Sequence, residues 1–292
     1  MYDPVTFHER FTSDELDAQY NLRAGRPDYE VTVIPDWNKR SEAVRKQMSC
    51  TLDVRYGKGE KQKLDIFPCG DATAPTLVYF HGGYWQRGDK SIYSFLAKPY
   101  VVAGVNVVVA GYDLCPAVSI TRISEEAREA MVYIWRNAAE IGVNRDRLTV
   151  MGHSAGGHIT QMMMATDWSA IAGDLPRGLV HAGIPVSPLS LLEPVRLTLK
   201  LNEGIRMDAV EAEAESPMLN HPPVTNASQL VVVGGAETEE FHRQAQMYFD
   251  AFATSERAME LYIVPGVDHF DELNVLADPD SPFFLKTIRV MA

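Results

Sequence analysis

The pentapeptide GHSAG, centred on Ser154, constrains the fold of this chain more than any other stretch. The apolar run LTVM, residues 148–151, precedes it, and a helical pattern follows over residues 155–165. A serine between a strand and a helix is held on a tight, strained turn, with its hydroxyl projecting above the sheet. Side chains two positions before and after the serine would collide, so Gly152 and Gly156 suit this turn. The context predicts that Ser154 is a nucleophile rather than a serine that only caps a helix.

Apolar segments alternate with helical patterns along most of the chain. Continuous β-branched runs suit strands that are buried on both faces, as in a parallel sheet. Strands that alternate with helices imply βαβ units. The sequence therefore predicts an α/β fold, with a mostly parallel central sheet and helices on both faces. The strands are expected at residues 76–80, 105–110, 148–151, 179–185, 229–233 and 260–264, with a hairpin at 50–56 and 63–67, and the helices at 124–139 (opening at Ser124), 155–165 and 238–252.

Two stretches fall outside this alternation, residues 1–50 and residues 187–223. Because the alternation of strands and helices runs to the end of the chain, we expect a single domain that spans residues 1–292. The two outlying stretches are then expected to form a small cap over the carboxyl edge of the sheet. Within the first stretch, helices are expected at residues 11–20, capped by Thr12 or Ser13, and at residues 37–47.

The segment HGGYW directly follows the strand predicted at residues 76–80. Acyl transfer generates an oxyanion, and backbone N–H donors aimed at it usually supply a large share of the catalysis. Glycines let a backbone approach the substrate closely. We therefore expect the N–H groups of Gly82, Gly83 and Ala155 to form an oxyanion hole.

The partners of a serine on this kind of turn follow it in the chain order Ser, acid, His. The loop after the last predicted strand, PGVDHF, contains His269, and no other histidine is placed as well for a base. The turn GGAE after the preceding strand ends in Glu237, our choice for the acid that orients the imidazole. Glu239 and Glu240 lie close by and remain alternatives. Asp268 adjoins the base and is expected to brace its loop.

Composition narrows the possible partners. The chain has 292 residues and a formal net charge of -12 at pH 7, and an acidic surface repels nucleic acid. No apolar run approaches the roughly 18 residues that a membrane helix needs, and residues 1–4 lack the features of a secretory leader. We therefore expect a cytoplasmic protein. The three cysteines form neither a disulfide framework nor a metal pair, and His153 and His158 are wrongly spaced for one helix face, so no metal or cofactor is expected.

Together these motifs resemble the kynurenine formamidase (arylformamidase) branch of the hormone-sensitive-lipase-like α/β-hydrolases. HGGYW is specific, because the wider esterase family usually has a third glycine there. The resemblance implies the α/β-hydrolase fold and metal-free hydrolysis of an aryl formamide, such as N-formylkynurenine, to an amine and formate. Animal members carry Asp where this chain has Glu237, and Glu resembles bacterial relatives described as esterases or hydrolases. The matching stretches are HGGYWQ at 81–86, Tyr112-Asp113 followed by Pro116, GHSAG at 152–156, EFHRQ at 240–244 and VDHF at 267–270.

The substrate is expected to be a small molecule that contacts residues of these stretches. Tyr84 and Trp85 either line an acyl or aromatic pocket or pack under a loop. Tyr20 resembles a residue that this branch packs near its active site. His153 and Phe270, next to the predicted nucleophile and base, are included among the expected contacts, although the side chain of His153 is expected to point away from the serine hydroxyl.

Two other functions remain open at this stage. A general short-chain carboxylesterase would use the same machinery on a different acyl group. A non-catalytic binding protein on a hydrolase scaffold is a remote alternative, because such proteins usually lose a member of the triad, and Ser154, His269 and Glu237 are all present. The sequence does not decide the oligomeric state, for which a homodimer is one candidate.

Overall fold

The framework of the protein is one eight-stranded sheet with the strand order β1-β2-β4-β3-β5-β6-β7-β8. A computed structural model describes residues 6–292; residues 1–5, which contain the stretch used to judge a secretory leader, lie outside it. β2 pairs antiparallel with β1 and with β4, and all other neighbours are parallel. The strands are β1 (Thr51–Arg55), β2 (Lys63–Phe67), β3 (Thr76–Phe80), β4 (Asn106–Ala110), β5 (Leu148–His153), β6 (Val180–Val186), β7 (Ser228–Gly234) and β8 (Met259–Val264).

The strands form where apolar, β-branched runs predict them. β3, β4 and β5 are buried along their whole length, as strands covered on both faces must be. β8 lies at the edge of the sheet, and most of its residues are partly or fully exposed. Because the strands from β3 to β8 run parallel, the loops that follow β3, β5, β6, β7 and β8 all leave the same edge of the sheet.

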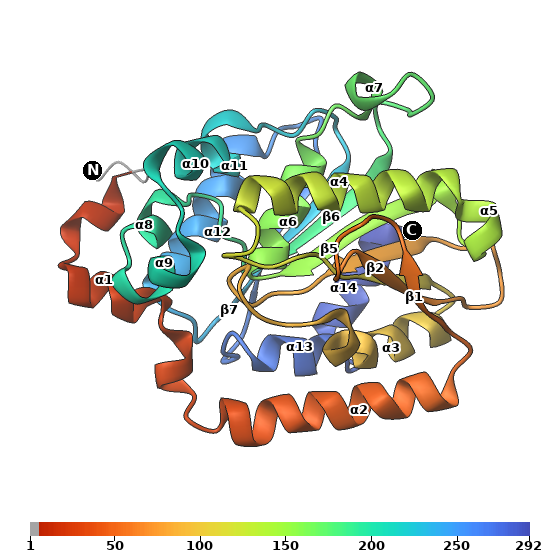
Figure 1. The fold of residues 1–292 in the computed structure, drawn as a ribbon, viewed down its shortest axis with the longest axis horizontal. Helices are drawn as coiled ribbons and strands as arrows, with labels where there is room; N and C mark the ends of the chain where they lie inside the picture. Colours follow the sequence, from red (N-terminus) through yellow and green to blue (C-terminus); the bar gives the residue numbers. More distant parts are fainter. Residues whose placement is uncertain (1–5) are drawn as a thin grey trace.

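Helices cover both faces of the sheet (Figure 1). They are α1 (Ser13–Tyr20), α2 (Ile34–Gln47), α3 (Ala97–Val102), α4 (Ile120–Arg136), α5 (Ala138–Ile141), α6 (Ala155–Met164), α7 (Trp168–Ile171), α8 (Glu193–Arg196), α9 (Leu199–Ile205), α10 (Ala209–Ala214), α11 (Pro217–Asn220), α12 (Glu239–Phe252), α13 (Asp271–Leu276) and α14 (Pro282–Met291). One apolar core contains the inner faces of α4, α6 and α12, and a second contains those of α2, α3, α13 and α14. Within residues 6–292, no helix is both long and apolar enough to cross a membrane.

The start of α4 differs from the sequence prediction. The helix begins at Ile120, and the hydroxyl of Ser119 caps it by accepting the N–H of Arg122. Ser124, the predicted start, is fully buried instead, and its hydroxyl donates to Glu215 at 2.7 Å. The prediction was wrong because the apolar spacing of the helix extends one turn further back than the polar Ser-Glu-Glu sequence suggests.

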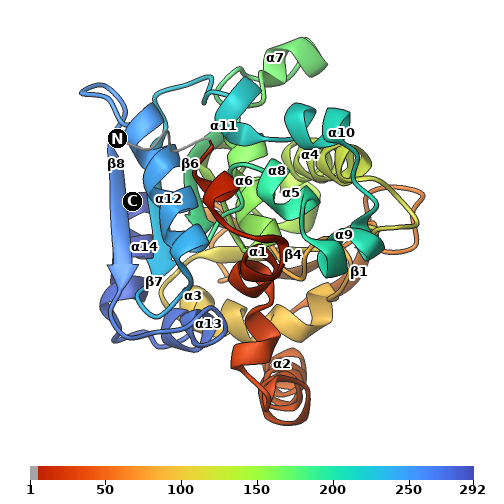
Figure 2. The same cartoon turned by 90° about the vertical axis from the view of Figure 1, so that its left-hand side faces the viewer.

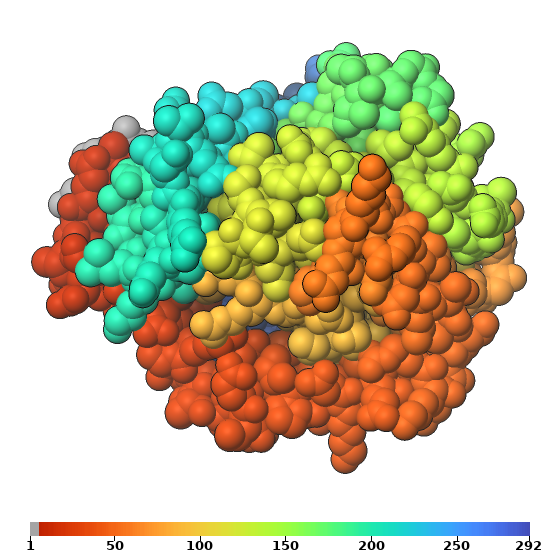
Figure 3. All heavy atoms as spheres, viewed as in Figure 1, coloured from red at the N-terminus to blue at the C-terminus, as the bar shows by residue number. Residues whose placement is uncertain are grey.

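The N-terminal segment contributes two helices that lie in different places. α1 is capped by Thr12, one of the two predicted caps, which forms a capping box with Glu15. This helix contacts α9 and α12 (Figure 2), and in the space-filling view it adjoins the segment of residues 187–223 (Figure 3). α2 begins at Ile34 and packs against the 3-10 turn Lys90–Leu96, in the second core. Only the part of the segment before α2 therefore lies beside residues 187–223.

Candidate active site

Ser154 lies on the turn between β5 and α6 in a strained backbone conformation. Its φ is 60° and its ψ is -118°, a region that residues with side chains seldom adopt. The N–H of Ser154 donates to the carbonyl oxygen of Val186, at the end of β6, at 2.8 Å. A Cβ on Gly152 would lie 2.1 Å from the carbonyl oxygen of Gly156, and one on Gly156 would lie 2.0 Å from that of Phe80. Both positions therefore require glycine, as the predicted turn does.

The loop after β3 lies directly against this turn. A Cβ on Gly82 would lie 3.0 Å from the Cβ of Ser154, so the backbone of the loop reaches the serine with no side chain between them. Gly83 has a φ of 122°, which only glycine adopts readily. Within residues 6–292, the N–H groups of Gly82, Gly83 and Ala155 donate to no other group. Ala155 is the first residue of α6, where the helix dipole is positive, so these three donors are available to an anionic oxygen.

His269 and Glu237 come from the loops after two neighbouring parallel strands, β8 and β7. The Nδ1 atom of His269 lies 2.6 Å from Oε2 of Glu237, and both side chains are buried. The other carboxylate oxygen, Oε1, accepts the N–H of Gly234 at 3.0 Å and contacts the hydroxyl of Ser187. A carboxylate at Nδ1 fixes the orientation of the ring and its tautomer, leaving Nε2 as the nitrogen that can accept a proton. His269 and Ser154 line the same cavity.

The two alternative acids are engaged elsewhere. Glu239 is exposed and forms an ion pair with Arg10. Glu240 is fully buried, lies 2.7 Å from Arg243, and accepts the phenol O–H of Tyr20 at 2.7 Å. Of the three acidic residues, Glu237 is the one in contact with the imidazole.

Asp268 lies where a residue that braces the loop should lie. Its Oδ1 accepts the N–H groups of Phe270 at 3.0 Å and Asp271 at 2.8 Å. Its Oδ2 lies 2.6 Å from Nη1 of Arg26, which also contacts Asp271 at 2.8 Å. The arginine therefore ties the N-terminal segment to the loop that carries His269.

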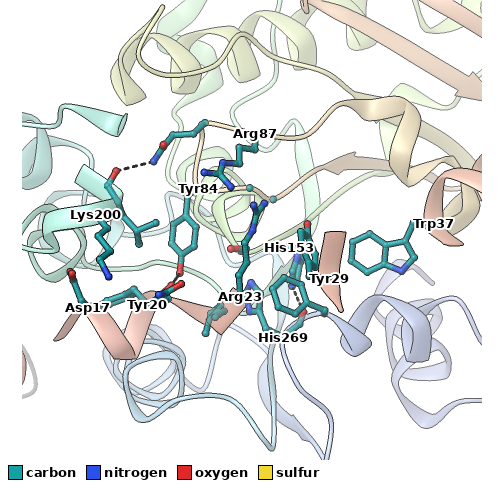
Figure 4. Close-up of a pocket in the computed structure, with 18 of the residues that line it drawn as sticks. Asp17, Tyr20, Arg23, Tyr29, Trp37, Tyr84, Arg87, His153, Lys200 and His269 are labelled. Atoms are coloured by element: carbon teal, nitrogen blue, oxygen red, sulfur yellow. Dashed lines mark hydrogen bonds between the residues drawn. The ribbon is translucent and has the colours of Figure 1, made fainter. Parts of the chain in front are cut away.

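A cavity of about 260 Å³ opens beside Ser154 and His269. The loop after β3 and the turn between β5 and α6 form its floor. Its walls come from the N-terminal segment, α9 and the second core (Figure 4). Aromatic rings and cationic side chains dominate the lining. The aromatic residues are Tyr20, Tyr29, Trp37, Tyr84, Tyr93 and Phe270, and the charged ones are Arg23, Arg87, Lys200 and Asp17.

Four of the five predicted substrate contacts line this cavity: Tyr20, Tyr84, His153 and Phe270. The phenol O–H of Tyr84 donates to the backbone carbonyl of Tyr20 at 2.8 Å, which joins the loop after β3 to the N-terminal segment (Figure 4). Trp85 does not line the cavity. Its ring is fully buried and packs edge-on against His158, with ring centroids 5.2 Å apart. The ring therefore packs inside the fold, as in the second of the two readings of Trp85, and does not line an acyl or aromatic pocket.

His153 is buried beside His269, with ring centroids 4.3 Å apart. Its Nε2 lies 2.8 Å from the carbonyl oxygen of His269 and 3.4 Å from Oε2 of Glu272. Burial, followed by the effect of the neighbouring imidazole, lowers the pKa of His153 well below its ordinary value of 6.5. The ring is therefore neutral, and its Nε2–H holds the loop of the predicted base in place.

His153, His269 and Glu272 also offer ligand atoms within 4.8 Å of one another, a spacing that a metal ion could use. The donors are already engaged, however. A metal at this point would take the nitrogen by which His153 holds the loop, or the imidazole that pairs with Glu237. These side chains therefore fit the positioning of the loop better than the coordination of a metal.

Several residues of the site were not predicted from the sequence. Arg23, Arg87 and Lys200 carry no motif, and only the proximity of Arg87 to HGGYW could have drawn attention to it. Ser187 and Glu272 lie beneath Glu237, where neither composition nor spacing points to them.

Comparisons with known proteins agree with this geometry. A family model described as alpha/beta hydrolase fold matches residues 77–271. A kynurenine formamidase of Salmo salar is 30% identical over 95% of this chain and 96% of its own length, and one of Drosophila melanogaster is 31% identical over 85% of both chains. A crystal structure from Silicibacter sp., solved under a provisional thioesterase name, is 33% identical, covers 93% of this chain and 98% of its own, and has a TM-score of 0.78.

Proposed function

Because this chain belongs to the α/β-hydrolase fold family, in the branch of the kynurenine formamidases, and is a hydrolase, we propose that it is a metal-independent serine hydrolase of aryl formamides. The products would be an aryl amine and formate. A cytoplasmic location and a small-molecule substrate are part of the proposal, and a homodimer remains the candidate assembly.

In the proposed mechanism, Ser154 attacks the formyl carbon while His269 takes its proton at Nε2. Glu237 accepts the Nδ1–H of the imidazole, whose positive charge it stabilises across the 2.6 Å contact. The carbonyl oxygen becomes an oxyanion, held by the N–H groups of Gly82, Gly83 and Ala155.

Collapse of this tetrahedral intermediate breaks the C–N bond. His269 gives its proton to the leaving nitrogen, so the aryl amine departs neutral and a formyl ester remains on Ser154. Water then attacks the ester carbonyl as His269 takes one of its protons. The imidazole returns this proton to the serine oxygen, and formic acid leaves and releases its own proton to solvent as it becomes formate. No redox change or external cofactor is needed for this balance.

The observation that carries the choice of an aryl formamide is the lining of the cavity. Tyr29, Trp37 and Phe270 line the space in which an aromatic leaving group would lie. Arg23 and Arg87 lie over the same space (Figure 4). Within residues 6–292, Arg87 has no carboxylate partner, whereas Arg23 pairs with Glu30 at 2.7 Å. Arg87 is therefore the arginine open to a substrate, with Arg23 as a second positive charge beside it. On a chain of net charge -12, this arrangement favours an aryl substrate that also carries a carboxylate, as N-formylkynurenine does.

A comparison of substrates tests the proposal. We expect kcat/KM for N-formylkynurenine to exceed that for p-nitrophenyl acetate by at least about tenfold, because the neutral ester cannot use the arginines. Ser154→Ala should abolish turnover of both substrates and labelling by a fluorophosphonate, while the thermal unfolding profile stays that of a folded protein. Full activity of this variant would overturn the assignment of the nucleophile.

A second candidate is an esterase for short acyl groups, which the provisional thioesterase name of the solved relative favours. The same residues would act, and an alcohol or thiol would leave instead of an amine. A panel of formamides, oxygen esters and thioesters of equal acyl length separates the two candidates. Preference for a neutral ester over every formamide would support the esterase.

A further inference from the structure

Ser187 joins two carboxyl groups beneath the proposed triad. It follows β6 in a left-handed conformation, with a φ of 45°, and its N–H donates to the carbonyl oxygen of Val232 at 2.8 Å. Its Oγ contacts Oε1 of Glu237 and lies 2.7 Å from Oε2 of Glu272. Ser187 and the Glu272 side chain are completely buried, so no solvent separates these three groups.

The hydrogen bonds of this group require one proton more than the serine supplies. A hydroxyl has a single hydrogen, so Ser187 can donate to only one of the two carboxyl groups. The other contact is a hydrogen bond only if that carboxyl group is itself protonated.

The partners of each acid decide which one carries the proton. Glu237 accepts from Gly234 at 3.0 Å and from His269 at 2.6 Å, and such donors stabilise a carboxylate. Glu272 has no such support: its Oε1 is buried without a partner among the described residues. The charge therefore belongs on Glu237 and the proton on Glu272.

The other groups around Glu272 point the same way. Burial, and then the charge of Glu237, raises the pKa of Glu272 well above its ordinary value. The hydrogen bond with Ser187 opposes this rise, whereas the side-chain contact with Glu237 and the charge of Asp268 add to it. The remaining titratable neighbour is His153, which is neutral and lies 3.4 Å from Oε2. No arginine or lysine of residues 6–292 pairs with Glu272. An ionised carboxylate in this position would lack compensation for its desolvation.

We propose that Glu272 is a positioning residue of the proposed hydrolase. It is a neutral acid whose O–H donates a hydrogen bond to Oγ of Ser187, and the hydroxyl of Ser187 in turn donates a hydrogen bond to Glu237. The proposal rests on the function proposed above, because it assigns to Glu237 the role of orienting the base. The chain of donors would run from Glu272 through Ser187 to Glu237 and fix the plane of the carboxylate against Nδ1 of His269. It would also leave the pair of buried acids, Glu237 and Glu272, with a single negative charge. That charge would lie on Glu237, the acid that contacts the imidazole.

Three variants test this chain with p-nitrophenyl acetate hydrolysis and fluorophosphonate labelling, which do not depend on the formamide preference. Ser187→Ala removes the middle donor, and we expect kcat to fall about tenfold with KM unchanged. Glu272→Gln is neutral and can still donate to Ser187, so we expect kcat within about threefold of wild type. Glu272→Leu cannot donate and should match Ser187→Ala, and combining the two should add little further loss.

The pH profile distinguishes a neutral Glu272 from an ionised one. A neutral acid is replaced by a neutral amide in Glu272→Gln, so the acid limb of kcat/KM should not move. Had Glu272 been ionised, its replacement would remove a negative charge near His269, lower the pKa of the imidazole and shift the limb to lower pH. Such a shift, or a tenfold loss in Glu272→Gln with a folded protein, overturns the proposal.

Ser190→Ala is the matched control for the serine. Ser190 is also completely buried and lies on the same segment, but its Oγ accepts from Gln161 at 2.8 Å and does not touch Glu237. We expect wild-type kcat in this variant, and equal losses in both serine variants would refute the specific role of Ser187. If the wild type hydrolyses the ester but no formamide, the proposed substrate fails while the donor chain is still tested.

Discussion

Mild acid should destabilise the protein partly through His158, a histidine fully buried on α6. Its Nε2 lies 2.8 Å from the carbonyl oxygen of Glu215, and its ring packs against that of Trp85. Burial lowers the pKa of His158 from its ordinary 6.5 to about 4. Between these two pKa values, His158 is therefore protonated in the unfolded chain but not in the folded chain. The stability that the neutral ring contributes is complete above pH 6.5 and is lost as the pH falls toward 4.

The size of this effect follows from the difference between the two pKa values. At about pH 5 the unfolded ring is almost fully protonated and the folded ring only about one tenth so, a difference worth about 2 kcal/mol relative to about pH 7.5. His158→Gln keeps a donor for the carbonyl of Glu215 but cannot titrate. We therefore expect the free energy of unfolding of the variant to fall by about 2 kcal/mol less than that of wild type over this interval.

Urea unfolding followed by circular dichroism at about pH 7.5, 6 and 5 measures this difference. Other titrating groups, including His81, whose burial also lowers its pKa to about 4, are present in both proteins and cancel in the comparison. If the two proteins lose stability in parallel from neutral to acid pH, His158 is not held neutral by burial and the reasoning fails.

Three further changes test the site directly. Gly152→Ala would place a Cβ 2.1 Å from the carbonyl oxygen of Gly156, so it should displace the turn, lower the melting temperature and reduce kcat about a hundredfold or more. Gly173→Ala, where nothing lies within 4 Å, should have none of these three effects. Glu237→Asp withdraws the carboxylate from the imidazole by roughly one methylene, and we expect kcat to fall at least about tenfold; wild-type kcat would contradict the role of this carboxylate. Arg87→Ala should raise KM for N-formylkynurenine about tenfold and leave that for p-nitrophenyl acetate unchanged; equal effects on both substrates would exclude recognition of a carboxylate.

The sequence predicted the sheet well, because a strand buried on both faces must consist of a continuous run of apolar residues. Strands such as Thr76–Phe80 and Asn106–Ala110 consist almost entirely of apolar or β-branched residues and sit near the residues predicted for them. Helix boundaries were predicted less accurately, because a polar residue can lie inside a helix when another part of the chain supplies its hydrogen-bond partner. Ser124 lies inside α4, and its hydroxyl donates to Glu215. The helices Ala97–Val102 and Asp271–Leu276 were not predicted because each has only 6 residues. Pro282–Met291 was not predicted either, although its buried residues lie at helical spacing.

Ser154, Glu237 and His269 come together at one edge of the sheet, because the fold dictates the order in which its loops reach that edge. The sequence favours Glu237 over Glu239 and Glu240 only by its place in the turn after β7, and the contacts of the three side chains separate them further. Glu239 and Glu240 begin α12, whereas Glu237 lies in the turn before this helix, from which its side chain reaches the imidazole. Trp85 shows the converse limit. A motif that resembles a substrate-binding segment does not show where its side chains point, and this ring is fully buried against His158.

The donor chain beneath Glu237 could not have been read from the sequence at all. Ser187 and Glu237 are 50 residues apart, Ser187 and Glu272 are 85 apart, and neither serine nor glutamate is unusual in composition. What brings them together is the parallel arrangement of β6, β7 and β8, which delivers three successive loops to one buried point. A serine hydroxyl between two carboxyl groups becomes informative only when the contacts and the solvent exclusion are known. In this protein, the sequence identifies the groups proposed to react, whereas packing decides where the protons that orient them must lie.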